Sequence, residues 1–180
     1  IYFYAVLSDG TTAGNRTAFF LIGTFMALWV ILYGLIQANA PRILRAKTRP
    51  TDELIKVARG WAWRLAAVPA ILTGVAIIAG EPQLWLTISL VAGLLIFGIV
   101  FALNSSLHSY LILSFTKAER VTLDVGFYYM ANAAGRLAGT LLSGLTYQIC
   151  GLPLMLGVAA FMVALSAIMV GLLKPERSQP

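Results

Sequence analysis

Long apolar runs constrain the fold of this sequence more than any other feature. Residues 18–38, 84–115, 125–147 and 154–173 are nearly free of charge, and each is long enough to cross a bilayer, which takes about 20 helical residues. The chain is 59% hydrophobic and 11% charged, so it is far more apolar than a soluble domain. A backbone inside lipid must satisfy its own hydrogen bonds, which favours helices. The sequence therefore predicts an all-α integral membrane protein.

One further apolar segment and several short connections complete the expected topology. Residues 63–79, which contain Pro69, bring the expected number of transmembrane helices to about five. Residues 1–7 are apolar but too short to span, so we expect them to be a helix remnant in the C-terminal part of a longer chain. Turn-forming residues predict a loop at 8–15 and short turns at two further places, residues 80–83 and 150–153.

The connection over residues 40–62 is predicted to be a long basic loop. Residues 41–64 hold seven basic and two acidic side chains, which places this loop and the C-terminus on the cytoplasmic side. Within it, Pro50 and Thr51 followed by two acids predict the start of a short surface helix, ahead of a span beginning near Trp63. Because the positive charge lies in loops between spans, we expect it to set membrane orientation and not to bind nucleic acid.

Two polar side chains interrupt the apolar run 125–144. Asn132 and Arg136 lie near its middle, where a charge costs about 2.5–3.5 kcal/mol on insertion scales. Arg136 either binds a substrate anion through two parallel hydrogen bonds or pairs with an acid elsewhere in the protein. Asp124 is not that acid, because twelve helical residues span about 18 Å. Asn132 either binds substrate or forms a hydrogen bond to a neighbouring helix.

The same run carries small residues at every fourth position. This spacing forms a smooth face that a second helix can approach closely, and it predicts helix packing there. The residues of this face are Ala131, Gly135, Gly139 and Ser143.

Three other polar residues are candidates for the substrate pathway. Asn104 and His108 lie one helical turn apart, and His108 either relays protons, since imidazole titrates near neutrality, or is a polar residue near the interface. Asn104 is a second substrate-binding candidate. Tyr128 can stack on or hydrogen-bond a ligand, or it can serve packing.

Few residues suit enzymatic chemistry. The chain has one histidine and one cysteine, no paired carboxylates within the apolar runs, no glycine-rich phosphate loop and no metal-ligand spacing. We therefore expect no catalytic residues, no metal and no cofactor.

The succession of spans, with a long basic loop after residues 33–42, resembles the C-terminal half of a major facilitator superfamily transporter, from the end of helix 7 through helices 8–12. More narrowly, FALNSSLHSYLIL at 101–113 and VGFYYMANAAGRLAGTLLSG at 125–144 are similar to the ArsJ-type organoarsenical efflux permeases. The loop after Gly34 departs from the usual major facilitator motif because it lacks the acidic residue.

This resemblance implies a multi-pass protein of the bacterial inner membrane whose partners are the lipid bilayer and the N-terminal half of the same transporter. It implies alternating access, proton-driven antiport and export of 1-arseno-3-phosphoglycerate, which confers arsenate resistance. That small anionic substrate forms when glyceraldehyde-3-phosphate dehydrogenase uses arsenate in place of phosphate, which links the two proteins functionally. The alternatives are an exporter of a drug or a sugar phosphate, and a membrane scaffold or enzyme subunit that does not transport.

Overall fold

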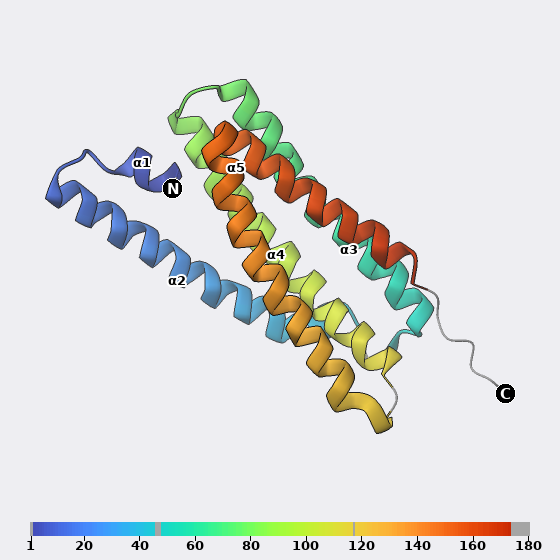
Figure 1. Ribbon diagram of the computed structural model, residues 1–180. Helices are drawn as coiled ribbons and strands as arrows, with labels where there is room; N and C mark the ends of the chain where they lie inside the picture. Colours follow the sequence, from blue (N-terminus) through green and yellow to red (C-terminus); the bar gives the residue numbers. More distant parts are fainter. Residues whose placement is uncertain (1, 46–47, 117, 174–180) are drawn as a thin grey trace.

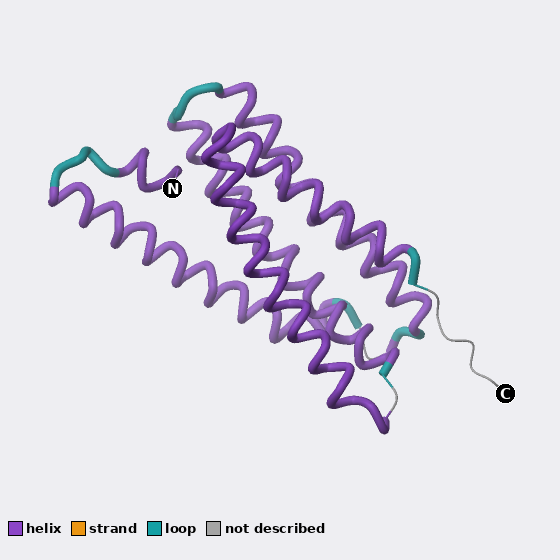
Figure 2. Tube along the Cα trace, viewed as in Figure 1, coloured by secondary structure: helices purple, strands orange, loops and turns teal. Residues whose placement is uncertain are grey.

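The computed structural model is helical throughout the residues that it describes, which are 2–45, 48–116 and 118–173 (Figure 1). Four long helices are apolar enough to cross a membrane by length and composition, and they lie side by side (Figure 2). The prediction of an all-α, membrane-embedded protein is therefore supported, while the expected count of about five spans is matched only loosely. The elements in chain order are α1 (Tyr2–Leu7), α2 (Thr12–Ile43), α3 (Thr51–Ala79), α4 (Leu84–Phe115), the 3-10 turn η2 (Ala118–Arg120) and α5 (Val121–Gly171).

The last helix, α5, is bent back on itself. A straight helix of its 51 residues would measure about 77 Å, far more than a bilayer core of about 30 Å. Cys150 (φ −138°, ψ 22°) and Gly151 (φ 68°, ψ −156°) leave helical geometry, and the chain reverses there (Figure 1). The positive φ of Gly151 is strained for other residues, and Pro153 follows two positions later. The predicted turn at 150–153 is confirmed. It divides α5 into a first arm (residues 121–149) and a second arm (residues 152–171).

The connections fall alternately at two ends of the bundle. The α2–α3 and α4–α5 connections share one end, which we call the basic end because Arg42, Arg45 and Arg120 lie there (Figure 1). The α3–α4 turn and the bend of α5 lie at the opposite end.

The connection at the basic end is shorter than predicted. α2 continues through Pro41 to Ile43, and α3 begins at Thr51, so seven residues separate the two helices. The predicted helix start at Thr51 is confirmed. The separate surface helix is wrong, because α3 runs unbroken from Thr51 to Ala79. The span predicted from about Trp63 lies within this helix and stays a prediction. Lysine and arginine are good helix formers, so a basic composition does not end a helix that a packed stretch continues.

The start of α2 also differs from the prediction. The helix begins at Thr12, inside the segment predicted as the loop 8–15, because Thr11 caps it. The Thr11 hydroxyl oxygen accepts a 3.0 Å hydrogen bond from the Gly14 amide, which satisfies one of the free donors of the first turn.

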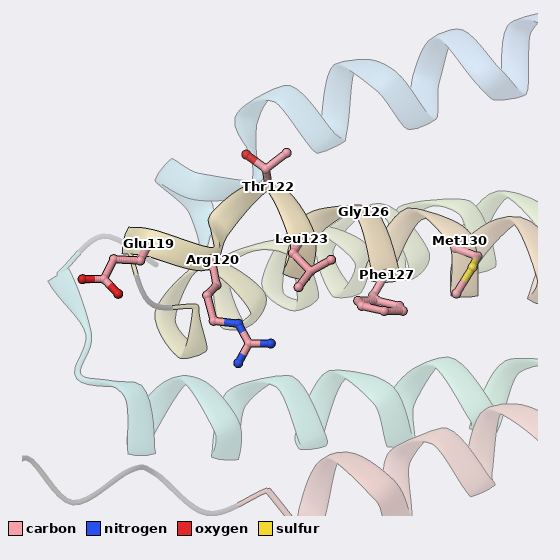
Figure 3. Close-up of a pocket in the computed structure, with 7 residues that line it drawn as sticks. All are labelled: Glu119, Arg120, Thr122, Leu123, Gly126, Phe127 and Met130. Carbon is pink, nitrogen blue, oxygen red and sulfur yellow. The ribbon is translucent and has the colours of Figure 1, made fainter.

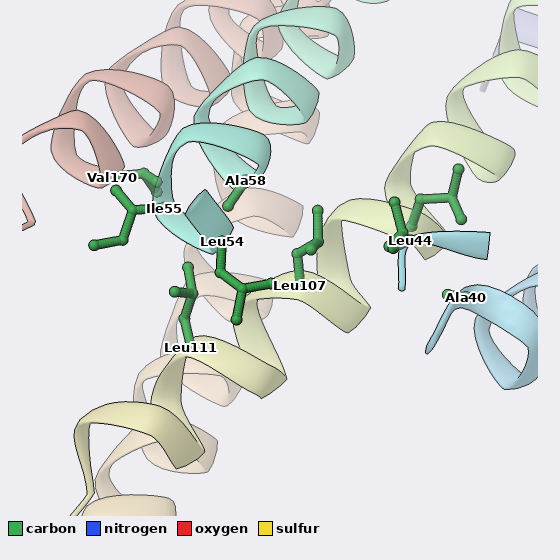
Figure 4. Close-up of a cluster of buried hydrophobic side chains, with 9 residues drawn as sticks. Ala40, Leu44, Leu54, Ile55, Ala58, Leu107, Leu111 and Val170 are labelled. Atoms are coloured by element: carbon green, nitrogen blue, oxygen red, sulfur yellow. The ribbon is translucent and has the colours of Figure 1, made fainter. Parts of the chain in front are cut away.

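The core lies on both sides of α3, which packs against α4 and the second arm of α5. Figure 4 shows the cluster at the basic end, where Leu54 and Ala58 of α3 lie near Leu107 and Leu111 of α4. Val170 of the second arm completes this cluster. A second cluster, at the opposite end, is formed by Tyr2, Leu72, Ala76, Ala79, Leu86 and Leu90.

One close contact holds α2 against α4. The indole Nε1 of Trp29 donates a 2.8 Å hydrogen bond to the backbone carbonyl of Leu94. The ring lies so near Gly98 that a Cβ at that position would be 2.7 Å from Nε1. Gly98 therefore permits the helices to approach, as small residues do between membrane helices.

Candidate functional site

Arg136 projects from the least covered part of the molecule. Every residue from 129 to 143, in the middle of the first arm, is exposed in this chain. Asn132 lies one turn before Arg136, and Thr140 lies one turn after it. The Thr140 hydroxyl donates a 2.9 Å hydrogen bond to the Arg136 carbonyl, so its hydrogen-bond donor is already used within the same helix. The polar side of the first arm thus presents a guanidinium and an amide that no neighbouring helix of the described chain covers.

The small-residue face is equally uncovered. Apart from the nearby residues of the same helix, no atom of the described residues lies within 4 Å of a Cβ built at Gly135 or at Gly139, and Ala131 is exposed as well. Only Ser143, near the bend, reaches other helices, where it lines a cavity of about 180 Å³ with Tyr2 and other residues. Helix packing on this face remains a prediction, and its partner is not a helix among the described residues.

Asn104 and His108 meet on α4, as their spacing predicted. The amide Nδ2 of Asn104 lies 3.3 Å from Nδ1 of His108. Asn104 is only 6% exposed, and its carbonyl oxygen Oδ1 is buried without a hydrogen-bond partner among the described residues. A buried acceptor without a donor costs about 1–3 kcal/mol, so it marks a place where a donor from elsewhere would bind favourably.

His108 shares a cavity with an acid that sequence reasoning did not select. About 400 Å³ of space lies between the end of α4 and the start of the first arm. His108 lines it on the α4 side and Asp124 on the α5 side, with Leu111, Ile112, Phe115, Thr116 and Leu173. From the sequence, Asp124 is relevant only as a possible partner for Arg136, which its distance excludes. Its position in the first turn of a span was the available signal, but its proximity to α4 depends on tertiary structure.

Tyr128 lies one turn beyond Asp124 on the first arm. Its side chain is half-buried, and its ring is tilted against that of Tyr129, with 5.6 Å between the ring centroids. Residues four apart share a helix face, so Tyr128 follows Asp124 along the same side.

The candidate residues therefore fall into two groups. One group, at the basic end, contains Asn104, His108 and Asp124. The other contains Asn132 and Arg136, and Arg136 is about 18 Å along the helix from Asp124. The structure does not bring the two groups together within this chain.

The start of the first arm carries a surface depression of about 520 Å³ (Figure 3). All of its lining residues come from one stretch, Glu119 to Met130, so it is the open side of a helix and not a cleft between elements. Figure 3 shows the charged Glu119 and Arg120 at one end and Phe127 and Met130 toward the other. It is an apolar surface with a charged rim at the level of the basic end.

Searches against protein-family models, curated proteins and solved structures found no match for this chain.

Proposed function

We propose that this chain is half of a secondary transporter of the major facilitator type, and that the first arm of α5 lines its substrate pathway. The observation that carries the proposal is the exposed stretch 129–143, which displays Arg136 and Asn132. The second arm, by contrast, lies on α3. An arginine that faced hydrocarbon at this depth would be costly, so this side of the arm faces water or protein.

The small-residue face next to Arg136 also supports the proposal that this chain is half of a transporter. Gly135 and Gly139 leave room for a helix that the described residues do not supply. We assign that helix to the N-terminal half of the transporter. The substrate would then bind near the bilayer midplane between the halves, which rock to give alternating access.

The proposed substrate is 1-arseno-3-phosphoglycerate, whose phosphate and arsenate groups are anionic. A guanidinium can bind such groups by two parallel hydrogen bonds, with Asn132, one helical turn away, as a further contact. Asn104 and Tyr128 lie nearer the basic end and are candidates for contacts elsewhere along the pathway. Export of this compound would confer arsenate resistance on a bacterium, from its inner membrane, with the basic end in the cytoplasm. Proton antiport would drive export, with His108 as the proton-coupling residue in the cavity that Asp124 also lines.

The experiment uses the full-length transporter in everted membrane vesicles. Arsenate, glyceraldehyde 3-phosphate, its dehydrogenase and the nicotinamide cofactor generate the unstable substrate in place, and arsenic accumulation is measured. We expect accumulation that requires the dehydrogenase, falls at least about tenfold in Arg136→Ala and is partly retained in Arg136→Lys. Equal membrane insertion of the variants is the control.

Two results would overturn parts of this proposal. Full accumulation in Arg136→Ala would make Arg136 structural. Absence of accumulation by the wild type under an imposed proton gradient would exclude the organoarsenical.

A sugar phosphate is the second candidate substrate. Arg136 favours it over a neutral drug, because a neutral compound gains little from a guanidinium. Accumulation of a labelled sugar phosphate without arsenate, lost again in Arg136→Ala, would select this candidate.

A further inference from the structure

A cavity of about 420 Å³ opens at the basic end, between the end of α2, the connection that follows it and α4. Its polar lining is concentrated in two arginines, a threonine and a tyrosine, and no acidic side chain of the described residues contributes to it. The lining residues are Ala38, Pro41, Arg42, Arg45, Thr48 and Tyr110. We propose that this cavity binds a phosphate group, and that an anionic lipid supplies it.

The charges around the cavity favour an anion. Arg42 and Arg45 each carry a planar guanidinium with five N–H donors, which suits phosphate oxygens, and the Tyr110 phenol can add another donor. Nearby Arg49 is already engaged, because its Nε donates a 3.1 Å hydrogen bond to the Leu44 carbonyl. Residues 41–64 hold seven basic and two acidic side chains, so the local potential is positive.

The backbone of Arg45 supports a binding role for its side chain. Its φ of 50° lies in the left-handed region, which costs a residue with a Cβ about 1–2 kcal/mol. The turn is held because the Arg45 carbonyl accepts hydrogen bonds from the Thr48 amide (3.2 Å) and hydroxyl (3.0 Å). Glycine would form this turn with less strain. The turn itself therefore gives no reason for an arginine at position 45, whereas binding of a phosphate in the cavity would.

The level of the cavity favours a lipid as the source. It lies where the apolar run of α2 ends, and the headgroups of a bilayer lie just beyond its hydrocarbon core. Ala38, Pro41 and the ring of Tyr110 give apolar contacts that a glycerol backbone can use and free phosphate cannot. Basic pockets between membrane helices bind anionic headgroups in this way.

The test measures lipid binding to the purified full-length transporter by native mass spectrometry, with phosphatidylglycerol and phosphatidylcholine as probes. The key variant is Arg42→Ala with Arg45→Gly, since glycine retains the left-handed turn while the guanidinium is lost. Arg16→Ala, which removes a charge at the opposite end, is the matched control. Thermal denaturation checks that all variants are folded.

We expect phosphatidylglycerol to bind more tightly than phosphatidylcholine. The double variant should lose about 25-fold in affinity for phosphatidylglycerol, at about fivefold for each arginine, and Arg16→Ala should lose none. Inorganic phosphate should not displace the lipid. If inorganic phosphate binds by itself and displaces the lipid, the cavity is a phosphate site, but the lipid part of the proposal is overturned.

Equal binding of the two lipids without any response to phosphate would overturn the proposal. Retained phosphatidylglycerol affinity in the folded double variant would do the same. The readout is binding and not transport, so neither result bears on the proposed function.

Discussion

The two arms of α5 are both apolar helices, yet they differ in what covers them. The second arm lies on α3, where Ala167 is fully buried and Val170 joins the basic-end cluster. The first arm is exposed from residue 129 to residue 143 and holds the only charge in the middle of any of the apolar runs, Arg136. The comparison teaches that apolar composition alone does not distinguish a helix that completes a bundle from one that faces a partner. Polar residues on one side of the helix, here Asn132 and Arg136, identify the arm that faces a partner.

The largest expected change in the free energy of unfolding distinguishes an alanine at Gly98, between packed helices, from one at Gly139 on the first arm. Gly98→Ala should lower the free energy of unfolding by about 2–3 kcal/mol, because the added methyl meets the Trp29 indole. Gly139→Ala, on the first arm, should leave it unchanged or raise it by up to about 1 kcal/mol, since alanine favours helix. Unfolding of this chain in mixed micelles by increasing SDS measures both variants.

A Trp29→Phe background gives the control for this pair. Gly98→Ala should cost less there, because phenylalanine is smaller and lacks the indole N–H. Equal losses at Gly98 and Gly139 would show that the first arm is packed in this chain after all.

The second effect compares one substitution on the two arms. Ala167→Leu should lower the free energy of unfolding by about 1–2 kcal/mol, because it overfills a fully buried position. Ala138→Leu, at an exposed position on the first arm, should change it by less than about 0.5 kcal/mol. The same SDS titration applies, and a loss at Ala138 as large as that at Ala167 would contradict the assignment of the packed arm.

The smallest effect concerns the two asparagines. Asn104→Leu should leave the free energy of unfolding unchanged or raise it by up to about 1 kcal/mol, because it removes a buried acceptor without a donor. Asn132→Leu should not alter it, but should lower transport. A loss above about 1 kcal/mol for Asn104→Leu would show that the asparagine stabilises the fold, through the 3.3 Å contact of its Nδ2 with His108 or through a partner of Oδ1.

The sequence predicted much of the fold because its strongest signals are local. The apolar runs located the long helices, Pro50 and Thr51 located the start of α3, and glycine and proline located the bend at 150–153. The continuity of α3 through its basic segment was not predicted, because a stretch rich in charged residues is typical of a loop. Here tertiary packing keeps that stretch helical. Leu54, Ile55 and Ala58 are the buried residues that stabilise that stretch.

The site was predictable only in part, for a related reason. Asn104 and His108 share one helix, so their spacing was enough to pair them. The cavity between His108 and Asp124 depends on how α4 meets α5, which no local pattern records. The turn that places Arg45 depends on a backbone angle that is unusual for arginine, and residue type alone predicts the opposite.

Accessibility of the first arm to water tests the central claim most directly. In a Cys150→Ser background of the full-length protein, single cysteines replace Asn132, Thr140 and Ala138, and a membrane-impermeant maleimide is added to membranes. Ala138 lies about 200° around the helix from Arg136, so it serves as the matched control on the opposite side. We predict rapid labelling at positions 132 and 140, slowed by substrate, and little labelling at 138. Equal labelling at all three positions, or none at 132 and 140, would contradict a water-filled pathway along the first arm.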